Sequence, residues 1–93
     1  MQELDPLLHN QLRLAIMALL AQNESVTFPY IVEKTGASRG NVSVQLTNLE
    51  EAGYIEIQKR FVGKKPQTSA SITTSGMQAM QEYTEALKSY LDL

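Results

Sequence analysis

The apolar residues of this chain first repeat with a helical period in residues 6–22. Asp5 followed by Pro6 is typical of an N-cap with proline at the first helical position. The second half of the stretch, Leu14–Ala21, is apolar on every side, so it must be covered from two directions. We therefore expect a helix over residues 6–22 that packs on the core and also on another helix or a second chain.

A short second helix is predicted over residues 28–35. Thr27 is a suitable cap, Pro29 is tolerated in a first turn, and Gly36 is placed to end the helix in the left-handed conformation. The apolar stripe, at i, i+3 and i+4, consists of Phe28, Ile31 and Val32.

A third helix is predicted over residues 38–52, with Ser38 as its cap and Gly53 as its stop. Its inward positions are Val42, Leu46 and Leu49. A turn of three or four residues that contains a glycine between two such helices is the signature of a helix-turn-helix.

A strand period replaces the helical period in residues 54–62. A turn over residues 63–67 separates them from a second alternating stretch, residues 68–73. Together they predict a hairpin over residues 54–73, and a hairpin directly after a helix-turn-helix makes it winged.

The chain closes with a predicted helix over residues 75–91, whose apolar residues show the 3, 4, 3 spacing of a helix-on-helix seam. Because so short a chain has little core for two apolar helices, we expect a homodimer through the first and last helices. Packing of both helices within one chain is the alternative. The expected interface consists of Leu8, Leu12, Ile16, Met80, Tyr83, Leu87, Tyr90 and Leu91.

This order of elements predicts one domain over residues 1–93, in the α+β class and mostly α. The expected fold is a winged helix-turn-helix with a three-helix core, a β-hairpin wing and a long C-terminal dimerisation helix. The 93 residues include no cysteine, which excludes disulfides and thiolate metal sites. The longest apolar run is far shorter than the roughly 20 residues of a membrane span. We expect a cytoplasmic protein without membrane partner, cofactor or metal.

The outward side of the third helix carries almost no charge. At about 100° per residue, small neutral polar side chains and one valine lie opposite the inward set. A merely solvated helix is the alternative, but these groups suit the hydrogen-bonding edges and thymine methyls of a DNA major groove. The predicted contacts with double-stranded DNA are Ser38, Arg39, Gly40, Asn41, Ser43, Val44, Thr47 and Asn48.

Charge is concentrated although the net charge is only −2, since six of the eight basic residues lie between positions 34 and 65. Four of them fall in the hairpin, where a wing would meet the phosphates beside a groove. A solvated charge run is the alternative. The predicted wing contacts are Lys59, Arg60, Lys64 and Lys65.

Three stretches together resemble the winged helix-turn-helix regulators related to the MarR and ArsR families: TGASRGNVSVQLTNLEEAGYIE, FVGKKPQTSASIT and TTSGMQAMQEY. The resemblance extends from about residue 12 to residue 91. It implies a transcriptional regulator that dimerises through its first and last helices, with residues 38–52 in the major groove and residues 59–67 as the wing. The second wing strand departs from the pattern, because Ser69, Ala70 and Ser71 replace larger residues, and we expect it to be loosely packed.

Other functions have less support. His9 is the one histidine, and no phosphate loop or metal-ligand spacing accompanies it, so we do not expect an enzyme. A winged helix that binds protein instead of DNA is the main alternative, because fold alone does not decide between them. An additional hypothesis is a small apolar effector lined by Met17, Met80 and Tyr83, although methionine at such spacing is more often core.

Overall fold

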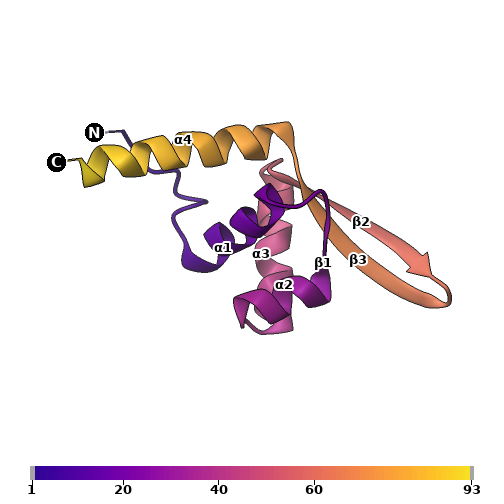
Figure 1. Cartoon of the computed structure of the whole chain (residues 1–93). Coiled ribbons are helices and arrows are strands. Elements are labelled where there is room, and N and C mark those ends of the chain that lie inside the picture. The colour runs from indigo at the N-terminus through magenta and orange to yellow at the C-terminus, as the bar shows by residue number, and fades with distance from the viewer. Residues whose placement is uncertain (1, 93) are drawn as a thin grey trace.

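The computed structural model describes residues 2–92, which form a helical body and a projecting hairpin. The helices are α1 (Gln11–Ala21), α2 (Phe28–Thr35), α3 (Arg39–Glu51) and α4 (Thr74–Leu91). The strands are β1 (Val26–Thr27), β2 (Ile55–Val62) and β3 (Lys65–Ile72). Figure 1 shows α1, α2 and α3 gathered on one side of α4, with the β2–β3 hairpin extending away from them. The molecule is elongated, 54 × 25 × 21 Å, and the predicted winged helix-turn-helix fold is confirmed.

A single hydrophobic core joins the helices to the base of the sheet. All three predicted inward residues of α3 are buried in it, and so are side chains from α1, α2 and both long strands. The largest fully buried side chains are Leu8, Ile16, Met17, Leu20, Ile31, Val42, Leu49 and Ile55. Because one side of α3 is committed to this core, its opposite side is held outward.

The predicted caps of α2 and α3 are present. The Thr27 hydroxyl accepts a hydrogen bond from Tyr30 N at 3.4 Å, and the Ser38 hydroxyl accepts one from Asn41 N at 3.1 Å. Gly36 has φ +70°, the left-handed conformation that ends α2. These local interactions position the turn between α2 and α3, as the sequence predicts.

The start of the first helix differs from the prediction, because α1 begins at Gln11 and not at residue 6. Asn10 has an extended backbone, φ −151° and ψ 128°, and its side chain accepts from Arg13 N at 2.9 Å. Asp5 instead forms a local turn, accepting from Leu7 N at 2.9 Å. The asparagine side chain thus competes with helix continuation and becomes the true cap. The resulting bend directs Leu8 into the core.

The sheet contains a strand that the sequence analysis missed. β1 pairs antiparallel with β3, through Val26 with Ala70 and Thr27 with Ser69, so the strand order is β1-β3-β2. Ser69 and Ala70 are both buried. The expectation of a loosely packed second wing strand is therefore wrong at Ser69 and Ala70, because β3 pairs with β1 as well as with β2 and both side chains are buried.

The wing turn is tighter than predicted, since β3 begins at Lys65 and not at residue 68. The two-residue turn starts with Gly63 at φ +67°, and no non-glycine residue among the described residues has positive φ. This matches a type II′ turn, whose twist suits a hairpin. Pro66 pairs with Phe61, next to the pair that flanks the turn. Adjacent pairs alternate between bonded and non-bonded, so Pro66 sits where no ladder hydrogen bond is lost.

Gly76 allows α4 to start against the end of α3. The Thr73 hydroxyl caps α4 by accepting from Gly76 N at 3.0 Å, and it donates to Gly53 O at 2.6 Å. A Cβ added to Gly76 would lie 2.1 Å from Tyr54 O. The spacing of Thr73 and Gly76 therefore has a steric role, because it lets the start of α4 pack on the backbone that follows α3.

Candidate nucleic-acid interface

The outward face of α3 is exposed along the whole helix. Gly40, Asn41, Ser43 and Thr47 are exposed, and Asn48 is partly so. Val44 keeps 56% of its surface in contact with solvent, although it is apolar. No other described part of the chain covers this face, so it is free to meet a partner.

The outward face of α3 is uncharged but presents several kinds of chemical group. Thr47 Oγ1 donates to Ser43 O at 3.1 Å, so its methyl group is turned away from the helix backbone. No charged residue lies in α3 between Arg39 and Glu50. A surface of amides, hydroxyls and methyl groups matches the donors, acceptors and thymine methyls that base pairs present in a major groove.

The start of α3 combines free backbone N–H groups with a positive charge. Helix N-termini attract anions because their first N–H groups lack partners inside the helix. Here Arg39 follows the Ser38 cap, and its guanidinium lies 5.0 Å from the centre of the Phe28 ring. Stacking on that ring holds the guanidinium at the edge of the helix-turn-helix. Gly40 has no neighbouring atom within 4 Å of a Cβ built on it, so this edge is open.

A groove separates α3 from the wing. It is lined from both sides, by the outward edge of α3 and by the sheet face that carries Ile57 and Lys59. Its lining residues are Phe28, Arg39, Ser43, Leu46, Thr47, Glu50, Ile57, Lys59 and Thr68. Arg39 lies on the α3 side of the groove and Lys59 on the β2 side. Positive charge therefore borders both sides of the groove, where a phosphate backbone would lie.

The four basic residues of the wing are all exposed, but they do not share one face. In an antiparallel hairpin neighbouring residues point to opposite faces, so Lys59 and Arg60 diverge. Lys64 lies in the turn and Lys65 begins β3. The tip also carries two apolar side chains that the sequence analysis passed over, Phe61 and Val62, with 74% and 58% of their surfaces exposed.

Two residues that no sequence pattern indicated support α3 from the side. Arg13 on α1 donates through Nη1 to Gln45 Oε1 at 2.6 Å, and Gln45 Nε2 donates to Asn41 Oδ1 at 3.0 Å. Arg13 lies 32 positions before Gln45, so no local pattern links them. Gln45 projects to the edge of the helix between the inward and outward sides, which is why the helical projection assigned it to neither.

The predicted dimer residues divide into buried and exposed groups. Leu8 and Ile16 have no exposed surface, so they belong to the protomer core and are not available to a second chain. Tyr83 is also buried, and its hydroxyl lies 3.1 Å from His9 Nδ1. The prediction is wrong for these residues because α1 and the N-terminal segment already fill that side of α4. Leu12 and Met80 are partly buried, and Leu87, Tyr90 and Leu91 are exposed.

An apolar stripe on α4, exposed except at the partly buried Met80, is shifted from the predicted seam. Its residues follow the 3-4-3-4 spacing of a coiled-coil seam: Met77, Met80, Thr84, Leu87 and Leu91. Thr84 fits because its hydroxyl donates to Met80 O at 2.9 Å, which leaves its methyl group facing outward. We call these five residues the α4 stripe.

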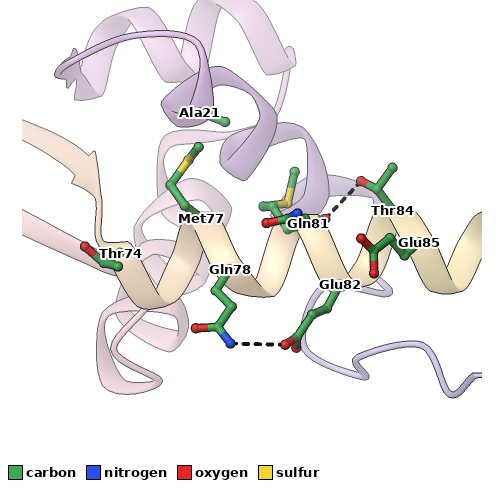
Figure 2. A pocket seen from close by; sticks show the side chains of 9 residues that line it. Ala21, Thr74, Met77, Gln78, Gln81, Glu82, Thr84 and Glu85 are labelled. Carbon is green, nitrogen blue, oxygen red and sulfur yellow. Dashed lines mark hydrogen bonds between the residues drawn. The ribbon is translucent and has the colours of Figure 1, made fainter.

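Figure 2 shows an open depression that is lined in part by Met77, Met80 and Thr84 of this stripe. Met77 lies near Ala21 of α1, and Gln78 Nε2 donates to Glu82 Oε1 at 3.2 Å. The three side chains predicted to line an effector pocket do not meet there. Met80 reaches the depression, whereas Met17 and Tyr83 are buried in the core.

Metal and membrane features are absent from residues 2–92. No three His, Asp or Glu side chains in that range come together to hold a metal ion. No helix in it is both long and apolar enough to cross a membrane.

The chain is similar to several proteins of known sequence or structure. An uncharacterised protein of Methanocaldococcus jannaschii is 35% identical over 71 residues, which cover 76% of this chain and 77% of that protein. A transcriptional regulator homologue from Pyrococcus horikoshii is 28% identical and superposes with a TM-score of 0.85, covering 92% of this chain and 85% of the other.

Two more distant structures contain operator DNA. Bacillus subtilis PadR with its operator is 20% identical, with a TM-score of 0.72 over 81% of this chain and 47% of PadR. A mutant MarR of E. coli with its operator is 14% identical, with a TM-score of 0.70 over 78% of this chain and 51% of MarR. This chain thus spans about half the length of either regulator, and at these identities the likeness concerns the fold.

The family match covers most of the chain. Residues 12–91 match the family described as "Winged helix DNA-binding domain", which is a family of DNA-binding domains and not of enzymes. That range includes the helix-turn-helix, the wing and α4. The chain therefore belongs to the winged helix DNA-binding domain family.

Proposed function

We propose that this protein is a dimeric transcriptional regulator that binds double-stranded DNA sequence-specifically. α3 lies in the major groove, and the wing contacts the flanking backbone or minor groove. The observation that carries this proposal is the division of α3 into a buried apolar side and an exposed side of neutral hydrogen-bonding groups. The operator DNA in the complexes of PadR and MarR supports duplex DNA as the partner.

Individual residues of α3 have distinct proposed roles. Arg39 suits guanine O6 and N7, the two asparagines and the two hydroxyl residues suit base edges, and Val44 suits a thymine methyl. Gly40 lets a phosphate backbone approach, and the N–H groups behind Ser38 bind one phosphate. The α3 contacts are thus Ser38, Arg39, Gly40, Asn41, Ser43, Val44, Thr47 and Asn48.

The wing supplies affinity rather than sequence choice. Lys59, Arg60, Lys64 and Lys65 are exposed on a hairpin that projects from the helices (Figure 1). Contacts between such cations and phosphates position a protein on DNA but carry no base information. With a net charge of −2, binding is expected to be modest and sensitive to salt.

Dimerisation is proposed through the α4 stripe. A stripe of apolar residues with coiled-coil spacing can pack on the same stripe of a second helix. In a two-fold dimer, the partner presents that identical stripe. Leu12, which is partly buried, and Tyr90, which is exposed, also belong to the predicted interface, and we propose that they extend it. The two copies of α3 would then lie about 34 Å apart, or somewhat further, and contact successive half-sites.

Selection of bound duplexes from a random pool tests this proposal. We expect a palindrome whose half-site spacing matches about one helical turn or slightly more. The absence of any enriched sequence would contradict sequence-specific binding.

A salt titration separates DNA binding from the alternative of a protein-interaction module. Lys64→Ala should reduce the slope of log K against log salt by about 1. Lys88→Ala on α4 is the matched control and should leave the slope unchanged. A wing that binds protein alone predicts no salt-dependent duplex binding, and that outcome would favour the alternative.

A further inference from the structure

A chain of side-chain hydrogen bonds runs from α1 to the outward face of α3. The Arg13 guanidinium is anchored by donating through Nε to Leu7 O at 2.5 Å. Its Nη1 donates to Gln45 Oε1 at 2.6 Å, and Gln45 Nε2 donates to Asn41 Oδ1 at 3.0 Å. Asn48 Nδ2 also donates to Gln45 Oε1, at 3.4 Å. Gln45 is thus the centre of a network that includes two of the proposed base-contacting residues.

The direction of every bond in this network follows from its first member. A guanidinium has donors and no acceptor, so Gln45 must turn its oxygen toward Arg13. The NH₂ group of the same amide then points along the helix toward Asn41. Asn41 must meet that donor with its oxygen, which leaves its own NH₂ group on the exposed side. Asn48 also donates its NH₂ group to the Gln45 oxygen. The carbonyl oxygen of Asn48 therefore remains on the outward side.

We propose that Gln45, oriented by Arg13, is a positioning residue that sets the hydrogen-bond polarity of the DNA-contacting face. This inference rests on the proposed function. It adds to that function a hydrogen-bonding role for each of the two asparagines. Asn41 presents a donor to the bases, and Asn48 presents an acceptor. Neither Arg13 nor Gln45 needs to touch DNA for this effect.

The polarity has consequences for base choice. Guanine offers O6 and N7 as acceptors and thymine offers O4, whereas cytosine offers only its N4 amino group in the major groove. The base facing Asn41 should therefore be guanine or thymine in preference to cytosine. The base facing Asn48 should carry an amino group, as cytosine and adenine do.

Gln45→Glu tests the proposal by changing one atom type. A carboxylate still accepts from Arg13, but it has no donor for Asn41, so the Asn41 amide should rotate and present its oxygen. Selection and competition with single-base variants of the operator should then show an inverted preference at that position, by on the order of tenfold. Gln45→Met removes both bonds and should flatten the preference without inverting it.

The added negative charge needs its own control, because it weakens binding to every duplex. Gln11→Glu makes the same chemical change at the exposed start of α1. Any loss of affinity that it causes should be the same for every duplex, and all base preferences should remain intact.

The outcomes separate this inference from the proposed function. If the wild-type chain binds with a sequence preference and Gln45→Glu leaves every preference unchanged, Gln45 does not set polarity and the proposed function stands. If the wild-type chain selects no sequence, the proposed function fails, and the role in base choice fails with it.

A measurement without DNA tests the network itself. In the free protein, Arg13→Met should shift the side-chain amide resonances of Asn41, although Gln45 lies between the two residues. Unshifted Asn41 signals, with the fold intact by amide spectra, would show that Arg13 does not orient the network.

Discussion

Two helices of this protein each hold one side in the core and expose the other, but their exposed sides differ in chemistry. The outward side of α3 consists of amides, hydroxyls and a single valine. The α4 stripe consists of methionine, leucine and a threonine whose hydroxyl is bonded to its own backbone. The outward side of α3 from Gly40 to Asn48 and the α4 stripe both lack charge, although Glu82, Glu85 and Lys88 are exposed elsewhere on α4.

The difference indicates what kind of partner each helix fits. Exposed polar groups that still have unused donors and acceptors favour a surface that offers hydrogen-bond partners, since burying them unpaired costs free energy. An apolar stripe gains most from a surface that is also apolar. DNA meets the first condition and a second copy of α4 meets the second. The two sides are thus complementary parts of one proposed mechanism, in which α4 sets the spacing and α3 selects the bases.

The largest expected effect comes from breaking the connection between the two helices. Gly76→Ala would place a Cβ 2.1 Å from Tyr54 O, so α4 must move away from the end of α3. We expect a loss of about 3 kcal/mol or more in the free energy of unfolding, measured by chemical denaturation.

Gly40→Ala is the matched control, because nothing lies within 4 Å of its added Cβ. On helix propensity alone it should stabilise α3 by up to about 1 kcal/mol. It should nevertheless weaken DNA binding if a phosphate approaches Gly40. Equal stability of the two alanine variants would contradict the close packing of Gly76.

The next effect concerns the α4 stripe alone. Leu87→Glu introduces a charge into the proposed seam at a side chain that is 37% exposed, so the protomer should still fold. We expect a monomer in sedimentation and a loss of about 100-fold or more in operator affinity, because two linked half-sites no longer bind together. Ser75→Glu, exposed on another side of the first turn, should remain dimeric. A Leu87→Glu variant that is still a dimer would show that α4 is not the interface.

A smaller effect distinguishes charge from geometry on α3. Arg39→Lys retains the positive charge but removes the planar fork that stacks on Phe28 and that we propose pairs with guanine. Preference for the best operator over a variant at that base should fall roughly tenfold. Binding to random duplex should change little. Equal losses on both duplexes would instead identify Arg39 as a phosphate contact.

Local rules account for what the sequence predicted well. Caps and left-handed glycines act within four residues, so Thr27, Ser38 and Gly36 could be assigned without tertiary information. Helical periodicity likewise identified the buried side of α3, and therefore the exposed side as well. The candidate DNA-contacting face was predictable because it is the complement of a regular apolar pattern.

The misses have tertiary causes. β1 is too short for an alternating pattern to appear, and it exists because β3 offers an edge. The proposed α4 stripe differs from the predicted seam because spacing alone did not show that Tyr83 is buried next to His9. Gln45 escaped notice because its partner Arg13 is distant in sequence. In each case the deciding contact joins residues far apart along the chain.

The smallest predicted effect concerns the hydrogen bond between the N-terminal segment and the residues that follow α3. Tyr54 Oη donates to Asp5 Oδ2 at 2.5 Å. This hydrogen bond, with partial burial and the charge of Asp5, raises the pKa of Tyr54 from 10.0 to about 12. The folded state therefore favours the protonated phenol, and the resulting stability is fully present below pH 10 and is lost as the pH rises through about 12.

Tyr54→Phe removes this bond and should lower the free energy of unfolding by about 1 kcal/mol at neutral pH. The difference from the wild type should shrink between pH 10 and 12, since the wild type alone loses the contribution there. Denaturation at several pH values measures it, with Tyr30→Phe on the exposed side of α2 as the control. A constant difference across that range would mean that the phenol's proton is not what holds Asp5, so that the N-terminal segment is kept in place by the packing of Leu8 instead.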